Sequence, residues 1–180
     1  MQAKTLSIAI LIVAGLGWAA PGGARAEVTA VPNQAQGKSS AAASAAASEV
    51  CALLTKQDAA AALGEGVSGP QSSSGRSAMP GTAVSSCEYT GSGLHKVQLS
   101  LWRLSPETAG QFQTVYRAEC AKKGHEGLSG LGDVACWYSE KHEELQVLKG
   151  ATFFSIELRK SGDPTEAIKG VAKKVFDQLR

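Results

Sequence analysis

Two spacings of apolar residues alternate along the last two-thirds of the chain. One spacing is typical of strands and the other of helices. Apolar residues at every second position predict a strand at Cys87 and Tyr89 and another from Val97 to Leu101. The segment Gly91-Ser92-Gly93 between them is typical of a hairpin turn. The same alternation predicts three later strands, over residues 134–138, 145–149 and 152–158.

Apolar residues three and four positions apart predict three amphipathic helices. Thr55 and Asp58 form a capping pattern for the first helix, which we expect to end at Gly64. Ser105, followed by a proline, is a good N-cap for the second helix. Its predicted apolar face is Ala109, Phe112, Val115, Tyr116 and Cys120. The third helix follows Asp163, and its apolar positions are Ile168, Val171, Ala172, Val175, Phe176 and Leu179.

The predicted order is α-β-β-α-β-β-β-α, which indicates an α+β fold. Because alternating strands bury one face, we expect an antiparallel sheet of about five strands with the helices packed on one face. Residues 64–86 are rich in Gly, Ser and Pro, so a long loop is predicted there.

The first residues have the layout of a secretory signal peptide. Lys4 precedes an apolar run from Leu6 to Trp18, and Ala24-Arg25-Ala26 gives a small-x-small cleavage site. A membrane anchor is the alternative, but the run is shorter than the ~20 residues of a spanning helix. We therefore expect residues 1–26 to be removed and the mature protein to be soluble, either periplasmic or secreted.

Residues 27–48 are mostly small and polar, with an Ala/Ser run at their end, and are predicted to be a flexible linker. A single α+β domain is expected over residues 49–180. The full chain has 18 basic and 16 acidic residues, and removal of the signal segment discards Lys4 and Arg25. The mature chain is then formally neutral, which makes nucleic acid an unexpected partner.

The four cysteines predict two disulfides, because an exported chain meets an oxidising compartment. Three pairings are possible. Cys120 lies on the apolar face of the second helix, and Cys136 shares a strand face with Val134, so we favour Cys120–Cys136 together with Cys51–Cys87. Zinc binding and redox chemistry are the alternatives, and the lack of a Cys-x-x-Cys pair weakens both.

Several short motifs resemble those of a known family. They are Cys51-Ala52-Leu53-Leu54-Thr55, Cys87-Glu88-Tyr89, Gly130-Leu131-Gly132-Asp133-Val134-Ala135 and Val147-x-Lys149-Gly150. Their order and spacing over residues 49–180 resemble the domain of unknown function found in actinobacterial exported lipoproteins. The chain differs in lacking the lipid-attachment cysteine. The resemblance implies no catalytic residues, and it implies a ligand-sensing or interaction module.

Other features give few signs of chemistry. The segment Gly127-Leu128-Ser129-Gly130-Leu131-Gly132 lacks the spacing of a nucleotide-binding loop, and a tight turn before a strand is expected instead. Trp102 and Trp137 each lie out of phase with the apolar residues of their strand. Both indoles are therefore candidates for an exposed contact surface, although a covering loop is the alternative. No catalytic residue, cofactor or metal site is predicted.

The sequence favours an exported, non-catalytic binding or interaction domain, expected to be a monomer. Its partner would be a protein or small ligand outside the cytoplasm. An inhibitor or immunity protein is one alternative, and a hydrolytic or metal-dependent enzyme is another. The enzyme alternative requires polar side chains that converge, and a cluster of His95, His125 or His142 with acids would be its sign.

Overall fold

The computed structural model describes residues 36–77, 81–122 and 124–179 of the chain. The predicted signal peptide and the first part of the predicted linker lie outside these residues. None of the helices among the described residues is long and apolar enough to cross a lipid bilayer.

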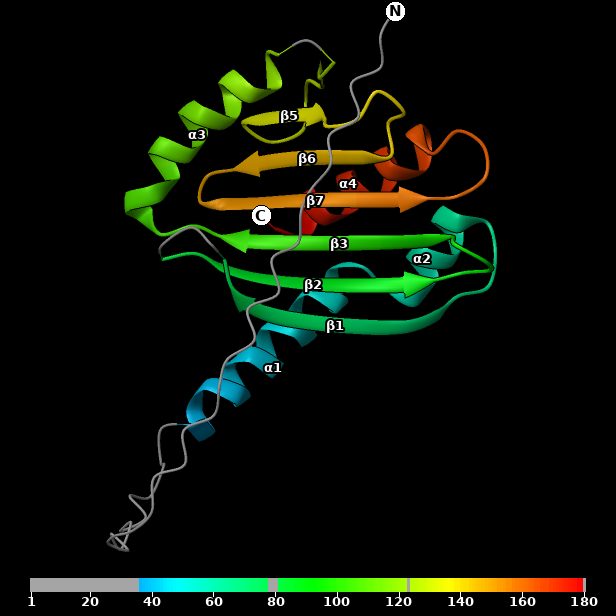
Figure 1. Cartoon of the computed structure of the whole chain (residues 1–180), viewed down its shortest axis with the longest axis horizontal. Coiled ribbons are helices and arrows are strands. Elements are labelled where there is room, and N and C mark those ends of the chain that lie inside the picture. Colours follow the sequence, from blue (N-terminus) through cyan, green and yellow to red (C-terminus); the bar gives the residue numbers. More distant parts are fainter. Residues whose placement is uncertain (1–35, 78–80, 123, 180) are drawn as a thin grey trace, which may run out of the picture. The chain divides into compact units, whose positions relative to one another are not determined.

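Seven antiparallel strands form one sheet in the order β1-β2-β3-β7-β6-β5-β4 (Figure 1). The α+β class is confirmed, but the sheet has more strands than the five expected. The strands are β1 (Ser68–Arg76), β2 (Ala83–Thr90), β3 (Lys96–Arg103), β4 (Glu126–Gly127), β5 (Val134–Trp137), β6 (Glu144–Lys149) and β7 (Thr152–Arg159). The helices are α1 (Gln36–Leu53), α2 (Lys56–Leu63), α3 (Pro106–Cys120) and α4 (Thr165–Gln178).

Helices pack on both faces of the sheet, so the expectation of helices on one face is wrong. Residues of α1, α2 and α4 share the main core with alternate residues of β2, β3, β5, β6 and β7. Residues on the other side of β3, β5, β6 and β7, among them Trp102 and Phe153, pack against α3 in a second, smaller core. The reason is that β3, β5, β6 and β7 carry large apolar side chains in both phases, which gives α3 an apolar surface of its own.

Helix α3 uses a narrower apolar face than the sequence predicts. Tyr116 is its one buried residue, and Phe112 packs beside it with ring centroids 5.8 Å apart. Val115, which we placed on the same face, is 67% exposed. It lies one position before Tyr116, and one step turns a helical side chain by about 100°.

Strand β1 and the first residues of β2 occupy much of the segment 64–86, where a long loop was predicted. β1 pairs with β2 along the edge of the sheet, and nearly all of its residues are exposed. An edge strand that buries neither face carries no apolar alternation, so the hydrophobic pattern could not reveal it. Residues 68–76 and 83–86 of the predicted loop therefore lie in strands β1 and β2.

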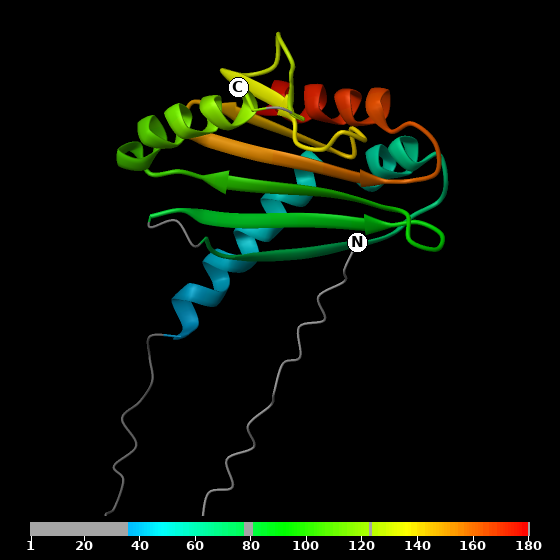
Figure 2. The same cartoon turned by 45° about the horizontal axis from the view of Figure 1, so that its top comes forward.

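Helix α1 begins at Gln36, inside the segment that we expected to be a linker, and continues to Leu53. It packs across β1 and β2, as Figure 2 shows. Ala47 and Val50 are buried there, and Cys51 is bonded to Cys87 of β2. The packed part of the chain thus begins before Glu49.

Residues 129–133, before β5, form a run of bends, and a close backbone contact requires glycine at position 132. Gly132 has φ +70°, and a Cβ atom there would overlap the carbonyl oxygen of Leu148 on β6. The backbone N–H of Asp133 donates to that same oxygen over 2.8 Å. The Asp133 carboxylate accepts from the N–H of Gly150 at 2.7 Å. This motif therefore joins the approach to β5 to the β6–β7 hairpin.

Candidate functional site

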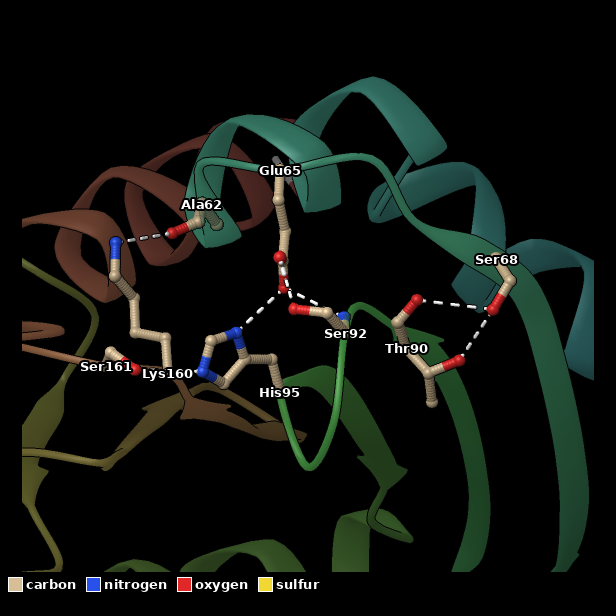
Figure 3. A network of polar contacts seen from close by, with 8 residues as sticks. All are labelled: Ala62, Glu65, Ser68, Thr90, Ser92, His95, Lys160 and Ser161. Atoms are coloured by element: carbon tan, nitrogen blue, oxygen red, sulfur yellow. Dashed lines mark hydrogen bonds and ion pairs between the residues drawn. The ribbon is translucent and has the colours of Figure 1, made fainter.

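Three connections meet at one end of the sheet, on the right in Figure 1. They are the α2–β1 connection with Glu65, the β2–β3 hairpin turn over residues 91–95, and the β7–α4 connection with Ser161. Figure 3 shows their polar side chains pointing toward one another. This cluster of Glu65, Ser92, His95 and Ser161, with the hairpin turn, is our candidate site.

The hairpin turn is tightly hydrogen bonded and carries an exposed leucine. The N–H of Gly91 donates to the carbonyl oxygen of His95 at 2.9 Å. The N–H of His95 donates to the carbonyl oxygen of Ser92 at 3.1 Å. Gly93 adopts φ +60°, which a residue with a Cβ rarely does. Leu94 is 91% exposed, the most exposed of the three large apolar side chains exposed among the described residues.

The Glu65 carboxylate holds this turn from outside the hairpin. It accepts from the backbone N–H of Ser92 at 3.0 Å, from the Ser92 hydroxyl at 2.6 Å and from Nδ1 of His95 at 2.8 Å. Gly91 makes the approach possible, because a Cβ atom there would overlap the carboxylate. The hydrogen bond from the Ser92 side chain, followed by that from His95, lowers the pKa of Glu65 to about 2. Glu65 is therefore ionised at neutral pH.

His95 joins the hairpin to the third connection. Its Nε2 lies 3.1 Å from the Ser161 hydroxyl oxygen. The residue before that serine, Lys160, donates from Nζ to the carbonyl oxygen of Ala62 on α2 at 3.1 Å (Figure 3). The β7–α4 connection is thus bonded both to the hairpin and to the helix that precedes Glu65. Side-chain exposure is 29% for His95 and 27% for Glu65, so the cluster is reachable from solvent.

The structure overturns the contact surface that we predicted from the two tryptophans. Trp137 is 1% exposed and lies in the main core, where His142 stacks on its ring at 4.6 Å. Trp102 is half-buried in the second core, with its ring centroid 5.0 Å from that of Phe153. The two indoles lie on opposite faces of the sheet. The phases of the strands were assigned correctly, but β5 is buried on both faces.

The cysteines pair as Cys51–Cys87 and Cys120–Cys136, which confirms the favoured pairing. Each bond joins a helix to the sheet, α1 to β2 and α3 to β5. In the part of the chain that the structure describes, no three His, Cys, Asp or Glu side chains could together hold a metal ion.

The other two histidines lie apart from the candidate site. His142 contacts the Glu126 carboxylate at 3.1 Å and the Thr165 hydroxyl at 3.2 Å. It thereby joins the β5–β6 connection to the start of α4. His125 lies beside Tyr138, and its Nδ1 lies 2.9 Å from the carbonyl oxygen of Glu119. His95 is thus the histidine that meets both a carboxylate and a serine hydroxyl.

The members of the candidate site are far apart in the sequence. Sequence reasoning named His95 as a possible partner of acids, but it did not identify Glu65 or Ser161. Glu65 is 30 positions from His95, and Ser161 is 66 positions beyond that histidine. The one local signal in the sequence is the hairpin segment, where Leu94 follows two glycines. No family model, curated protein or solved structure matches this chain.

Proposed function

We propose that this protein is an exported interaction domain and that Leu94, on the β2–β3 turn, contacts a protein partner. The observation that carries this proposal is a leucine with 91% exposure on a turn that Glu65 and His95 hold in place. An apolar side chain in water is unfavourable for the free protein, but it becomes favourable when a partner covers it.

The rigidity of the turn supports a binding role. Association costs free energy when loops and side chains must become ordered, so a turn already held in one conformation binds more tightly. Polar residues, Ser92 and His95, flank the leucine in the turn. The partner that fits is a protein with an apolar pocket surrounded by polar groups.

The proposal of export rests on the signal-like segment and on the two disulfides. Disulfides persist in the periplasm and outside the cell and are rare in the cytoplasm of most organisms. Intact mass spectrometry of the exported protein should give a chain that begins at Glu27 and carries no acyl group. A mature chain that retains Leu6 to Trp18 would contradict this part of the proposal.

The contact is tested by placing a photo-crosslinking amino acid at position 94 and, as a matched control, at position 115. Val115 is also an exposed apolar residue, but it lies on α3, the helix that covers the second core. Crosslinking in the producing cell should give one reproducible adduct from position 94 and none of the same mass from position 115. Equal adducts from both positions, or none from position 94, would overturn the proposal.

The identity of the crosslinked partner then separates the narrower hypotheses. An exported hydrolase or toxin whose activity the purified protein reduces would favour an inhibitor or immunity protein. A receptor or envelope protein would favour the interaction module that the resemblance to actinobacterial lipoprotein domains implies. In either case Leu94→Ser should weaken binding to the purified partner, whereas Val115→Ser should leave it unchanged.

A further inference from the structure

The order of the side chains at the candidate site is that of an activated serine. Ser161 Oγ lies 3.1 Å from His95 Nε2, and Nδ1 on the other side of the ring lies 2.8 Å from Glu65 Oε1. A hydroxyl, an imidazole and a carboxylate joined in this sequence form the usual arrangement for nucleophilic catalysis, in which a base activates the hydroxyl and a third group orients the base.

The proton positions follow from the hydrogen-bonding capacity of each group. An ionised carboxylate can only accept hydrogen bonds, so the His95 nitrogen that faces Glu65 must carry a proton. In the neutral ring the other nitrogen, Nε2, then has a free electron pair. The Ser161 hydroxyl donates to that pair, which is the direction that proton removal from the serine requires.

Neighbouring contacts hold the three groups in place. Glu65 is fixed by the backbone and side chain of Ser92, and the Lys160 hydrogen bond to Ala62 fixes the connection that carries Ser161. Helix α2, which precedes Glu65, is itself bonded to α4 through Asp58 and Lys174. Ser161 is exposed, so a small reagent can reach its oxygen.

We propose that Ser161 is an activated nucleophile that takes an acyl group from small activated esters, with His95 as its base and Glu65 as a positioning residue. The oxygen of Ser161 bonds to the carbonyl carbon, and its proton passes to His95 Nε2. The bond from that carbon to the leaving-group oxygen breaks, and the leaving oxygen takes the proton from the imidazole. Water then attacks the acyl-serine, the imidazole accepts its proton and returns it to Ser161, and the acid departs.

This proposal does not rest on the Leu94 contact, and it takes up the hydrolytic alternative rather than the non-catalytic domain expected from the sequence. Ser92 provides an internal comparison, because its hydroxyl donates directly to the Glu65 carboxylate and contacts no imidazole in the hydrogen bonds described. If a carboxylate alone could activate a serine here, Ser92 would react as readily as Ser161.

The test uses 4-nitrophenyl acetate with the purified, oxidised protein. Release of 4-nitrophenolate gives the rate, and peptide mass spectrometry locates the added acetyl group. We expect acetylation at Ser161, none at Ser92, and loss of the reaction in Ser161→Ala. His95→Gln should slow acetylation by about 100-fold, the lower range for general base catalysis. Ser68→Ala, which changes an exposed serine whose hydroxyl bonds to Thr90, should react like the parent protein.

Glu65→Gln separates activation from a merely structural role of the cluster. The amide can offer its N–H group to Nδ1 and so favour the tautomer in which Nε2 carries the proton, which slows acetylation even when melting temperature and circular dichroism are unchanged. Acetylation of Ser161 no faster than that of Ser92, or equal rates in folded His95→Gln and parent protein, would overturn the proposal. Loss of partner binding in Leu94→Ser bears on the proposed contact and leaves this result unaffected.

Discussion

The two faces of the sheet are covered to very different extents. Among the residues that the structure describes, 22 are buried in the main core, which α1, α2 and α4 cover, and five are buried in the second core, which α3 covers. The part of the second face that α3 leaves uncovered is polar, with Lys96 bonded to Glu88 and Gln98 at 3.2 and 3.3 Å. Since apolar burial supplies most of the stability of a fold, the first face should dominate the free energy of unfolding.

Each face nevertheless has one disulfide between a helix and a strand. Cys51–Cys87 joins α1 to a face that already has a large core, and Cys120–Cys136 joins α3 to a face with a small one. A helix with few buried residues opens locally more easily than one that shares the main core. Both bonds should therefore stabilise the whole fold, and Cys120–Cys136 should in addition limit the local opening of α3.

The largest effect should come from comparing the two tryptophans. Trp137→Ala removes a fully buried side chain from the main core and should lower the free energy of unfolding by about 3–5 kcal/mol. Trp102→Ala removes a half-buried ring from the second core and should cost about 1–2 kcal/mol. Urea titration of the oxidised proteins measures both. Equal losses of unfolding free energy in the two variants would mean that the first face does not dominate the stability of the fold.

The tryptophans also show what the sequence could predict. Periodicity located the strands from β2 onward that carry apolar alternation, and it placed Trp102 and Trp137 correctly out of phase with their neighbours. It could not show that a second helix covers the opposite face, because that depends on where α3 packs. Phase alone therefore indicates which residues share a face, but it does not indicate which faces are buried.

Removing each disulfide tests whether Cys120–Cys136 has this additional local effect on α3. In the chain-entropy relation, the 36-residue loop of Cys51–Cys87 is worth about 4 kcal/mol and the 16-residue loop of Cys120–Cys136 about 3 kcal/mol. Double Cys→Ala variants of each pair should lose these amounts in urea titration. In native-state hydrogen exchange, the Cys120→Ala/Cys136→Ala variant should lose protection mainly in α3. Equal loss of α3 protection in both variants would contradict the local role.

A smaller effect should appear in acid, and it belongs to the first face. Burial raises the pKa of Asp58, but hydrogen bonds from Lys174 and Thr55 outweigh it, so the pKa lies below its usual value. The folded protein then binds this proton less readily than the unfolded chain. The stabilisation is present above pH ~4 and is lost as the pH falls through the lowered pKa.

Urea titration of the parent protein and Asp58→Asn at pH 7 and below pH 4 measures this contribution. The difference in stability should be larger at pH 7 and should shrink in acid. Glu166→Gln is the control, because this side chain is 85% exposed and pairs with Lys169 at the surface of α4. It should differ little from the parent at either pH. A difference for Asp58→Asn that grows in acid would mean that the pKa of Asp58 is raised, not lowered, in the folded protein.

The candidate site lay beyond what the sequence could predict, for a different reason than the buried faces. Glu65 and Ser161 lie in connections, where no hydrophobic period sets a position, and they meet His95 only because the antiparallel order brings three connections to one end of the sheet. β1 was missed as well, and without it the path from α2 to the hairpin could not be traced. The reason for a glycine at position 91 can be recognised only when the position of the Glu65 carboxylate is known.

The smallest effect should distinguish the observed face of α3 from the one predicted by helical spacing. Val115 is 67% exposed, and valine and serine have similar helix propensities, so Val115→Ser should change the free energy of unfolding by less than about 0.5 kcal/mol. Phe112 packs on Tyr116 and Phe153, with ring centroids 5.8 and 5.1 Å away. Phe112→Ala should therefore cost about 1–3 kcal/mol, less than a fully buried phenylalanine. Similar losses for the two variants would mean that α3 is rotated on the sheet, with Val115 in contact with the second core.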